Sequence, residues 1–93
     1  MAVMILLPTA LQRYAHDKEQ LEVSGGSVGE ALQAVIAQAP LLGKHLFDSQ
    51  GQIRSFVNVY LGDDDTRYLQ GSATVVKDGD TLTIVPSIAG GAL

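Results

Sequence analysis

One amphipathic helix among several strand-like stretches limits what this chain can fold into. Five apolar residues recur at the spacing i, i+3, i+4, i+7 and i+8: Val28, Ala31, Leu32, Val35 and Ile36. This spacing predicts one apolar stripe along a helix. Ser27 and Glu30 predict its capping box, and Pro40 its end. Because a single helix cannot cover both faces of a sheet, it must pack across one face, in an α+β arrangement.

The strand-like stretches lie on both sides of this helix. Residues 1–7 are apolar at nearly every position, which favours an interior place in the sheet. Residues 20–24, 53–61 and 81–85 alternate as half-buried strands do, and residues 74–76 predict a further short strand. We expect a polar connection at 10–18, a short helical turn at 41–47, and turns at 48–51, 62–65 and 77–79.

Composition excludes several classes of function. The chain of 93 residues has 46% hydrophobic and 17% charged residues and a net charge of −4. No basic stripe is present for nucleic acid, and no apolar run is long enough for a membrane span, so we expect a cytoplasmic protein. Cysteine is absent, which excludes disulfides and a thiolate nucleophile. His16 and His45 are interpreted as surface or loop residues, so we expect neither catalytic nor metal-binding side chains.

The last residues have a different character from the rest of the chain. Pro86 removes a ladder donor and ends the last strand. Gly90 and Gly91 have no Cβ, so their backbone fits a narrow channel and permits close approach by another molecule. We therefore interpret residues 1–93 as one domain with a flexible tail from about residue 87, in which the tail is the working part.

The order of elements and several short sequences together resemble the MoaD/ThiS family of β-grasp, ubiquitin-like sulfur carriers. They are Leu-Pro-Thr at 7–9, Val-Gly-Glu-Ala-Leu at 28–32, Phe-Val-Asn-Val-Tyr at 56–60, Asp-Asp-Thr-Arg at 64–67, Asp-Gly-Asp at 78–80 and Ile-Val-Pro at 84–86 before Gly-Gly at 90–91. The ending and the Phe-Val-Asn segment look most like the branch that serves cysteine or homocysteine synthesis. The resemblance implies a mixed sheet of four to five strands, with the first and last strands adjacent in the middle.

The resemblance also implies a mechanism in which the chain is a carrier and not an enzyme. An E1-like adenylating enzyme of the MoeB/ThiF type spends ATP to convert the Gly91 carboxylate into an acyl-adenylate. Sulfur then displaces the leaving group and gives a thiocarboxylate, which donates sulfur to a sulfur-acceptor synthase. The chain itself binds no cofactor, and Gly90 and Gly91 are the expected sites of reaction.

Ala92 and Leu93 depart from the family pattern, whose working end is Gly-Gly. The branched side chain of Leu93 would obstruct a channel sized for glycine. One explanation is a native extension, which a zinc-dependent JAMM-type metalloprotease removes after Gly91. The other is a remnant of cloning, and we favour the native extension.

Four residues form the partner surface that we expect: Phe56, Tyr60, Arg67 and Ile88. Phe56 and Tyr60 share a sheet face with Val85, which is either a docking patch or part of the core. Arg67 could pair with Asp64 or Asp65, or meet an acidic partner. Alternative functions are the small subunit of molybdopterin synthase, a ubiquitin-like protein modifier joined to lysines through Gly91, and a plain interaction domain.

Overall fold

The computed structural model describes residues 2–55 and 57–86. Five strands and three α-helices make up its regular elements: β1 (Ala2–Leu6), α1 (Thr9–Gln12), β2 (Gln20–Ser24), α2 (Val28–Gln38), α3 (Gly43–Leu46), β3 (Val57–Leu61), β4 (Asp64–Asp65) and β5 (Thr81–Pro86). Short 3₁₀ turns join them: η1 (Arg13–Ala15), η2 (Pro40–Leu42), η3 (Thr66–Tyr68) and η4 (Gly71–Ala73). Within these described residues, no helix is long and apolar enough to cross a membrane.

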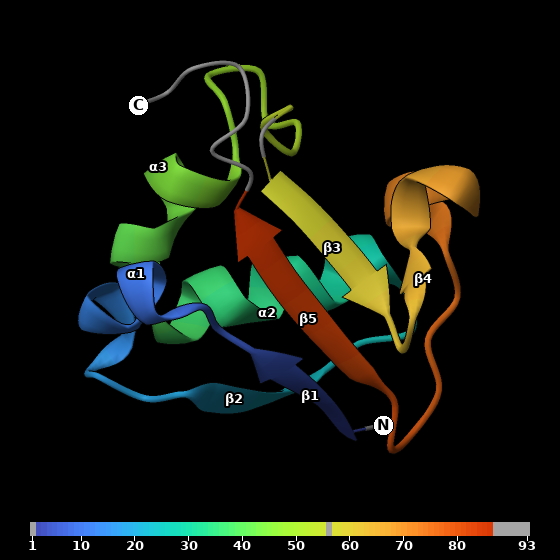
Figure 1. Cartoon of the computed structure of the whole chain (residues 1–93), viewed down its shortest axis with the longest axis horizontal. Coiled ribbons are helices and arrows are strands. Elements are labelled where there is room, and N and C mark those ends of the chain that lie inside the picture. The colour runs from blue at the N-terminus through green and yellow to red at the C-terminus, as the bar shows by residue number, and fades with distance from the viewer. Residues whose placement is uncertain (1, 56, 87–93) are drawn as a thin grey trace.

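The sheet is mixed, and its strand order is β2-β1-β5-β3-β4 (Figure 1). β5 lies in the middle, parallel to β1 and antiparallel to β3. β1 also pairs antiparallel with β2 along its whole length. The adjacent first and last strands are therefore confirmed, as is the interior position of the apolar first strand.

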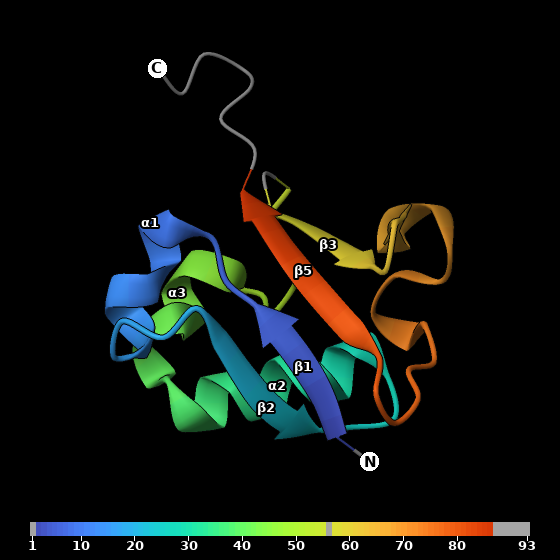
Figure 2. The ribbon, with the colours of Figure 1, turned by 60° about the horizontal axis from the view of Figure 1, so that its bottom comes forward.

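Helix α2 crosses one face of the sheet, as Figure 2 shows from below. Its apolar stripe is buried at Val28, Ala31, Leu32 and Val35. Alternate residues of every long strand face it, among them Val3, Leu21, Val59 and Ile84. Leu42 and Leu46, from the expected helical turn at 41–47, close the same core. The α+β interpretation, with one main helix across one face, is confirmed.

The start of α2 follows the capping pattern of its sequence with one difference. The Ser27 hydroxyl accepts a hydrogen bond from the Glu30 N–H at 3.2 Å. The Glu30 carboxylate accepts from the Gly26 N–H at 2.8 Å, one residue earlier than in a standard capping box. The Ser27 bond satisfies one of the backbone donors that a helix start leaves open, and the Glu30 bond fixes the residue before the cap.

The prediction of a polar connection at residues 10–18 was wrong. α1 and η1 occupy most of this stretch, and they bury Leu11 and Ala15 against the core. Helical turns this short do not repeat an apolar period along the sequence. The four-residue spacing between Leu11 and Ala15 is the only sequence signal for them.

Two strand predictions in the second half of the chain were also wrong. The third strand begins at Val57 and not at residue 53, because Ile53 makes only an isolated bridge to Phe47. Residues 74–76 form no strand. Val75 makes one bridge to Ser27. The short strand of the sheet is instead β4, which occupies the second half of the turn predicted at 62–65, so that part of the turn prediction was wrong as well. The alternating pattern at 53–61 begins before the first residue that pairs with a neighbouring strand.

Several predicted features lie outside the described residues. They are the flexible tail from about residue 87, Phe56, Ile88, Gly90, Gly91, Ala92 and Leu93.

Candidate functional site

The described part of the site is the root of the tail, where β5 ends at Pro86. β5 is flanked by β1 on one side and by β3 on the other, so the strand that leads to the tail is held from both sides. Val57 is the register partner of Pro86, and Asn58 is the partner of Val85. A strand paired on both sides is held rigidly, which suits a functional group attached at its end.

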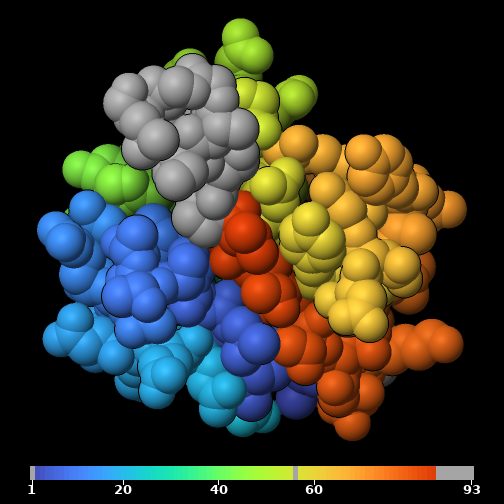
Figure 3. Space-filling model, in the orientation of Figure 1, coloured from blue at the N-terminus to red at the C-terminus, as the bar shows by residue number. Residues whose placement is uncertain are grey.

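The sheet face opposite α2 carries no helix among the described residues, and β5 crosses the middle of this face (Figure 3). Its residues on the central strands are half-buried or exposed: Met4, Leu6, Asn58, Tyr60, Thr83 and Val85. Val85 is 40% exposed. This face is therefore mixed in polarity and accessible beside the tail root, and it is not a second core.

Tyr60 lies on this face, as the sequence predicted, and it is half-buried. Its register partner is Thr83 on β5. The sequence pattern did not predict that Met4 and Leu6 lie on this sheet face. Leu6 pairs with Thr83 from the β1 side. The sequence could not show this, because β1 is apolar on both faces and nothing in its pattern marks the open one.

The guanidinium of Arg67 contacts the backbone. Its Nη2 donates hydrogen bonds to the backbone carbonyls of Ser55 and Val57, at 2.5 and 2.8 Å. Asp65 accepts a hydrogen bond from the backbone N–H of Arg67, and so contacts its main chain and not its guanidinium. Of the two roles that the sequence left open for Arg67, pairing with Asp64 or Asp65 is thus replaced by side chain to backbone bonds, and contact with an acidic partner stays a prediction.

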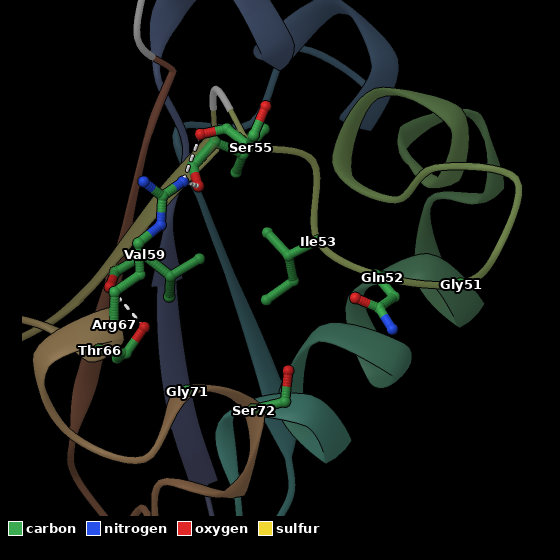
Figure 4. Close-up of a pocket in the computed structure, with 10 residues that line it drawn as sticks. Gly51, Gln52, Ile53, Ser55, Val59, Thr66, Arg67, Gly71 and Ser72 are labelled. Carbon is green, nitrogen blue, oxygen red and sulfur yellow. Dashed lines mark hydrogen bonds between the residues drawn. The ribbon is translucent and has the colours of Figure 1, made fainter.

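A cavity of about 630 Å³ lies beside this part of β3. In Figure 4, Ile53 and Val59 point into it from opposite walls, and Ser72 points into it from η4. Thr66, also in the wall, donates from Oγ1 to the Val59 carbonyl at 2.9 Å and is only 3% exposed. The cavity is open and has no cluster of ionisable groups, so it does not resemble an active site.

His45 is not the surface residue that the sequence suggested. Its ring stacks on Tyr14, with centroids 4.1 Å apart, and its Nε2 is buried without a hydrogen-bond partner. The guanidinium carbon of Arg13 lies over the Tyr14 ring, 6.0 Å from its centroid. This stack joins α3 to η1 and serves packing. In the described residues, no group of three His, Cys, Asp or Glu side chains is arranged to hold a metal ion.

One carboxyl group has a shifted pKa, and its cause is local. The backbone N–H groups of Gln52 and Gln50 donate to Asp48 Oδ1 at 3.0 and 2.8 Å. They lower the pKa of Asp48 below its usual value, because they stabilise the charged form. The same two hydrogen bonds organise the turn before β3, so Asp48 is interpreted as a turn residue.

The fold defines a small β-grasp protein of the ubiquitin-like class, in which a central strand leads to the C-terminal residues. A model of the ThiS family matches residues 5–91. The chain belongs to the ThiS family.

Individual relatives agree with this assignment. The sulfur carrier protein CysO of Mycobacterium tuberculosis is 34% identical over 93 residues, which cover 98% of this chain and all of the relative. A chain of the crystallised BexX/CysO complex of Amycolatopsis orientalis is 36% identical, with a TM-score of 0.88 over 97% of this chain and 100% of that one. Small archaeal modifier protein 3 of Haloferax volcanii is 32% identical over 65 residues, 70% of each chain. These likenesses support a sulfur-carrier or ubiquitin-like role, and they support an enzyme as partner.

Proposed function

We propose that this chain is a sulfur carrier whose reactive group is the C-terminal carboxylate of Gly91, once Ala92 and Leu93 have been removed. The observation that carries the proposal is the family match, which runs from residue 5 to Gly91. The relative with 34% identity over the full chain is a sulfur carrier protein. Pathways of the cysteine or homocysteine type are the favoured destination of the sulfur.

The proposed reaction has two steps. The Gly91 carboxylate attacks the α-phosphorus of ATP, which forms an acyl-adenylate and releases pyrophosphate. Sulfide then attacks the carbonyl carbon, AMP leaves, and a thiocarboxylate remains. An E1-like enzyme supplies positioning and electrostatic stabilisation for both steps, while the carrier supplies a substrate group on a rigid mount. This division of labour agrees with a chain that has no cysteine.

Trimming precedes activation in this scheme. A JAMM-type metalloprotease, which holds its own zinc, cleaves the peptide bond between Gly91 and Ala92 with water. The new carboxylate then lies on a residue without a side chain, which fits a narrow channel. We place both the trimming and the activation in the cytoplasm. The intact mass of the protein isolated from its own cells tests the trimming step directly.

The central test uses a chain that ends at Gly91. Incubation with a MoeB/ThiF-type enzyme, ATP and sulfide should raise its mass by the difference between sulfur and oxygen. The 93-residue chain and a Gly91→Ile variant of the trimmed chain are matched controls, and both should stay unmodified. Absence of the mass change with every such enzyme in the source genome would contradict the proposal.

A second candidate, a ubiquitin-like modifier, is favoured by the 32% identity to small archaeal modifier protein 3. It requires an isopeptide bond between Gly91 and a lysine of another protein. Mass spectrometry of cell lysates after pull-down of a tagged carrier distinguishes the two functions. Lysine adducts without thiocarboxylate would favour the modifier.

A further inference from the structure

The half of β3 nearest the tail root has a strand on one side only. β5 pairs with the full length of β3, from Val57 to Leu61. On the other side, β4 pairs with Tyr60 and Leu61 alone. Over the described residues, the outer edge of β3 from Val57 to Val59 therefore has no strand partner, and its outward carbonyls need other donors.

Side chains from η3 supply those donors. Arg67 Nη2 donates to the carbonyls of Ser55 and Val57, and Thr66 Oγ1 donates to the carbonyl of Val59. The three acceptors are alternate residues, as carbonyls along one edge of a strand are. Two neighbouring side chains thus take the place that another strand would fill, and Figure 4 shows both of them against this edge.

The backbone that carries these side chains is itself fixed. Asp65 Oδ1 caps η3 by accepting from the Arg67 N–H at 2.9 Å. The Leu69 N–H donates to the Thr66 carbonyl at 3.0 Å, which closes the turn. The guanidinium therefore extends from a short, closed turn, and one of its nitrogens reaches two carbonyls at once. A guanidinium is well suited to such multiple contacts.

Val57 connects Arg67 to the tail. Val57 is the register partner of Pro86, the last described residue before the tail. Pro86 has no N–H to give to the ladder. The Val57 N–H donates to the Arg54 carbonyl at 3.0 Å, and the Val57 carbonyl accepts from Arg67. Both backbone groups of Val57 are thus engaged away from β5, so this end of β3 is held from its outer edge as well as by the neighbouring Asn58↔Val85 pair.

We propose that Arg67 is a positioning residue for the chemistry of the tail. By holding the carbonyls of Ser55 and Val57, it fixes the strand against which β5 ends and so fixes the point where the tail leaves the sheet. Its proposed action runs through Val57. The proposal rests on the proposed sulfur-carrier function, since it concerns how well Gly91 is presented to an activating enzyme.

The experiment compares Arg67→Met and Arg67→Lys with the parent chain ending at Gly91. Lys18→Met, an exposed residue before β2, is the control for loss of one positive charge. Two readouts are taken on each protein. The first is amide hydrogen exchange of the carrier alone, at Val57, Asn58 and Val85 and, as an internal reference, at Val3 and Val23. The second is kcat and KM for thiocarboxylate formation with a MoeB/ThiF-type enzyme.

If Arg67 positions the tail root, Arg67→Met speeds exchange by about tenfold at the first group of amides and not at the reference amides. It also lowers kcat by about tenfold, since misplacement of a reacting group by a fraction of an ångström slows the step. Arg67→Lys restores both readouts partly and together, and Lys18→Met changes neither.

Other outcomes overturn the proposal. A raised KM with unchanged kcat and unchanged exchange would make Arg67 a direct partner contact. Equal acceleration of exchange at all five amides would make it a general stability residue. If the parent chain is never thiocarboxylated, the proposed function fails, and exchange of the carrier alone then decides whether Arg67 fixes the tail root.

Discussion

The two halves of the sheet are stabilised in different ways. In the β1–β2 half, backbone pairs with backbone at five consecutive positions, from Ala2↔Ser24 to Leu6↔Gln20. In the β3–β4 half, only two positions pair, and Arg67 and Thr66 bind the remaining outer carbonyls. The outer edge of β2 receives one side-chain bond from α2, from Gln38 Nε2 to the Glu22 carbonyl at 2.7 Å.

This difference bears on the proposed function, because β5 leads to the tail and borders both halves. A ladder of main-chain bonds depends little on any single side chain. An edge held by two side chains can be weakened by one substitution. The root of the tail is therefore more sensitive to mutation on its β3 side than on its β1 side.

The largest effect should come from the core that both halves share. Leu32 is 1% exposed on α2, and Leu32→Ala should lower the free energy of unfolding by about 2–5 kcal/mol through lost burial and a cavity. Leu41→Ala, at a residue 60% exposed, is the matched control and should change it little. Urea denaturation measures both. If amide hydrogen exchange in Leu32→Ala accelerated in one half of the sheet only, the two halves would not share one cooperative core.

Thr66→Val should affect the β3 half specifically. The change keeps the shape of a side chain that is 3% exposed but removes the donor to the Val59 carbonyl. Leaving a buried acceptor unsatisfied should cost about 1–3 kcal/mol of unfolding free energy. Thr83→Val, on the open face of β5, is the control. Amide hydrogen exchange locates the loss. An equal loss of exchange protection at the amides of β2 would contradict the division into two halves.

Gln38→Ala should have a smaller effect on the β1–β2 half. It removes the exposed bond to the Glu22 carbonyl while the five-position ladder remains. We expect a loss of about 0.5–1 kcal/mol relative to Gln33→Ala, an exposed position on the same helix. Chemical denaturation of the two variants gives the difference directly. A loss as large as that of Thr66→Val would mean that both edges depend on single side chains.

The same division explains which elements could be predicted from the sequence. Residues 20–24 alternate strictly, and the structure shows a strand there with Leu21 and Val23 inward. The stripe on α2 was likewise predictable, since both patterns report on burial against one face. The start of β3 was not, because its extent depends on where a partner strand is available, and the described register with β5 begins at Val57↔Pro86.

The candidate site was predictable only in part, for a related reason. Tyr60 on the open face follows from alternation, and it was found. The bonds of Arg67 to Ser55 and Val57 join residues that are twelve and ten positions apart. No periodic pattern records them, whereas the neighbouring aspartates suggested an ion pair. Met4 and Leu6 were missed because an all-apolar strand does not mark its open face.

The smallest effect concerns the turn that leads into the β3 half. The pKa of Asp48 is lowered by the N–H groups of Gln52 and Gln50, so its folded-state pKa lies below its unfolded-state value. Its stabilising contribution is therefore present above the unfolded-state pKa, about 3.9, and is lost as pH falls through the folded-state pKa. Asp48→Asn should lower Tm slightly at neutral pH, and the difference from the parent should vanish on acidification. Asp63→Asn, in the exposed turn after β3, is the control. A difference in Tm at Asp48 that persisted in acid would show that the side-chain shape, and not the charge, holds this turn.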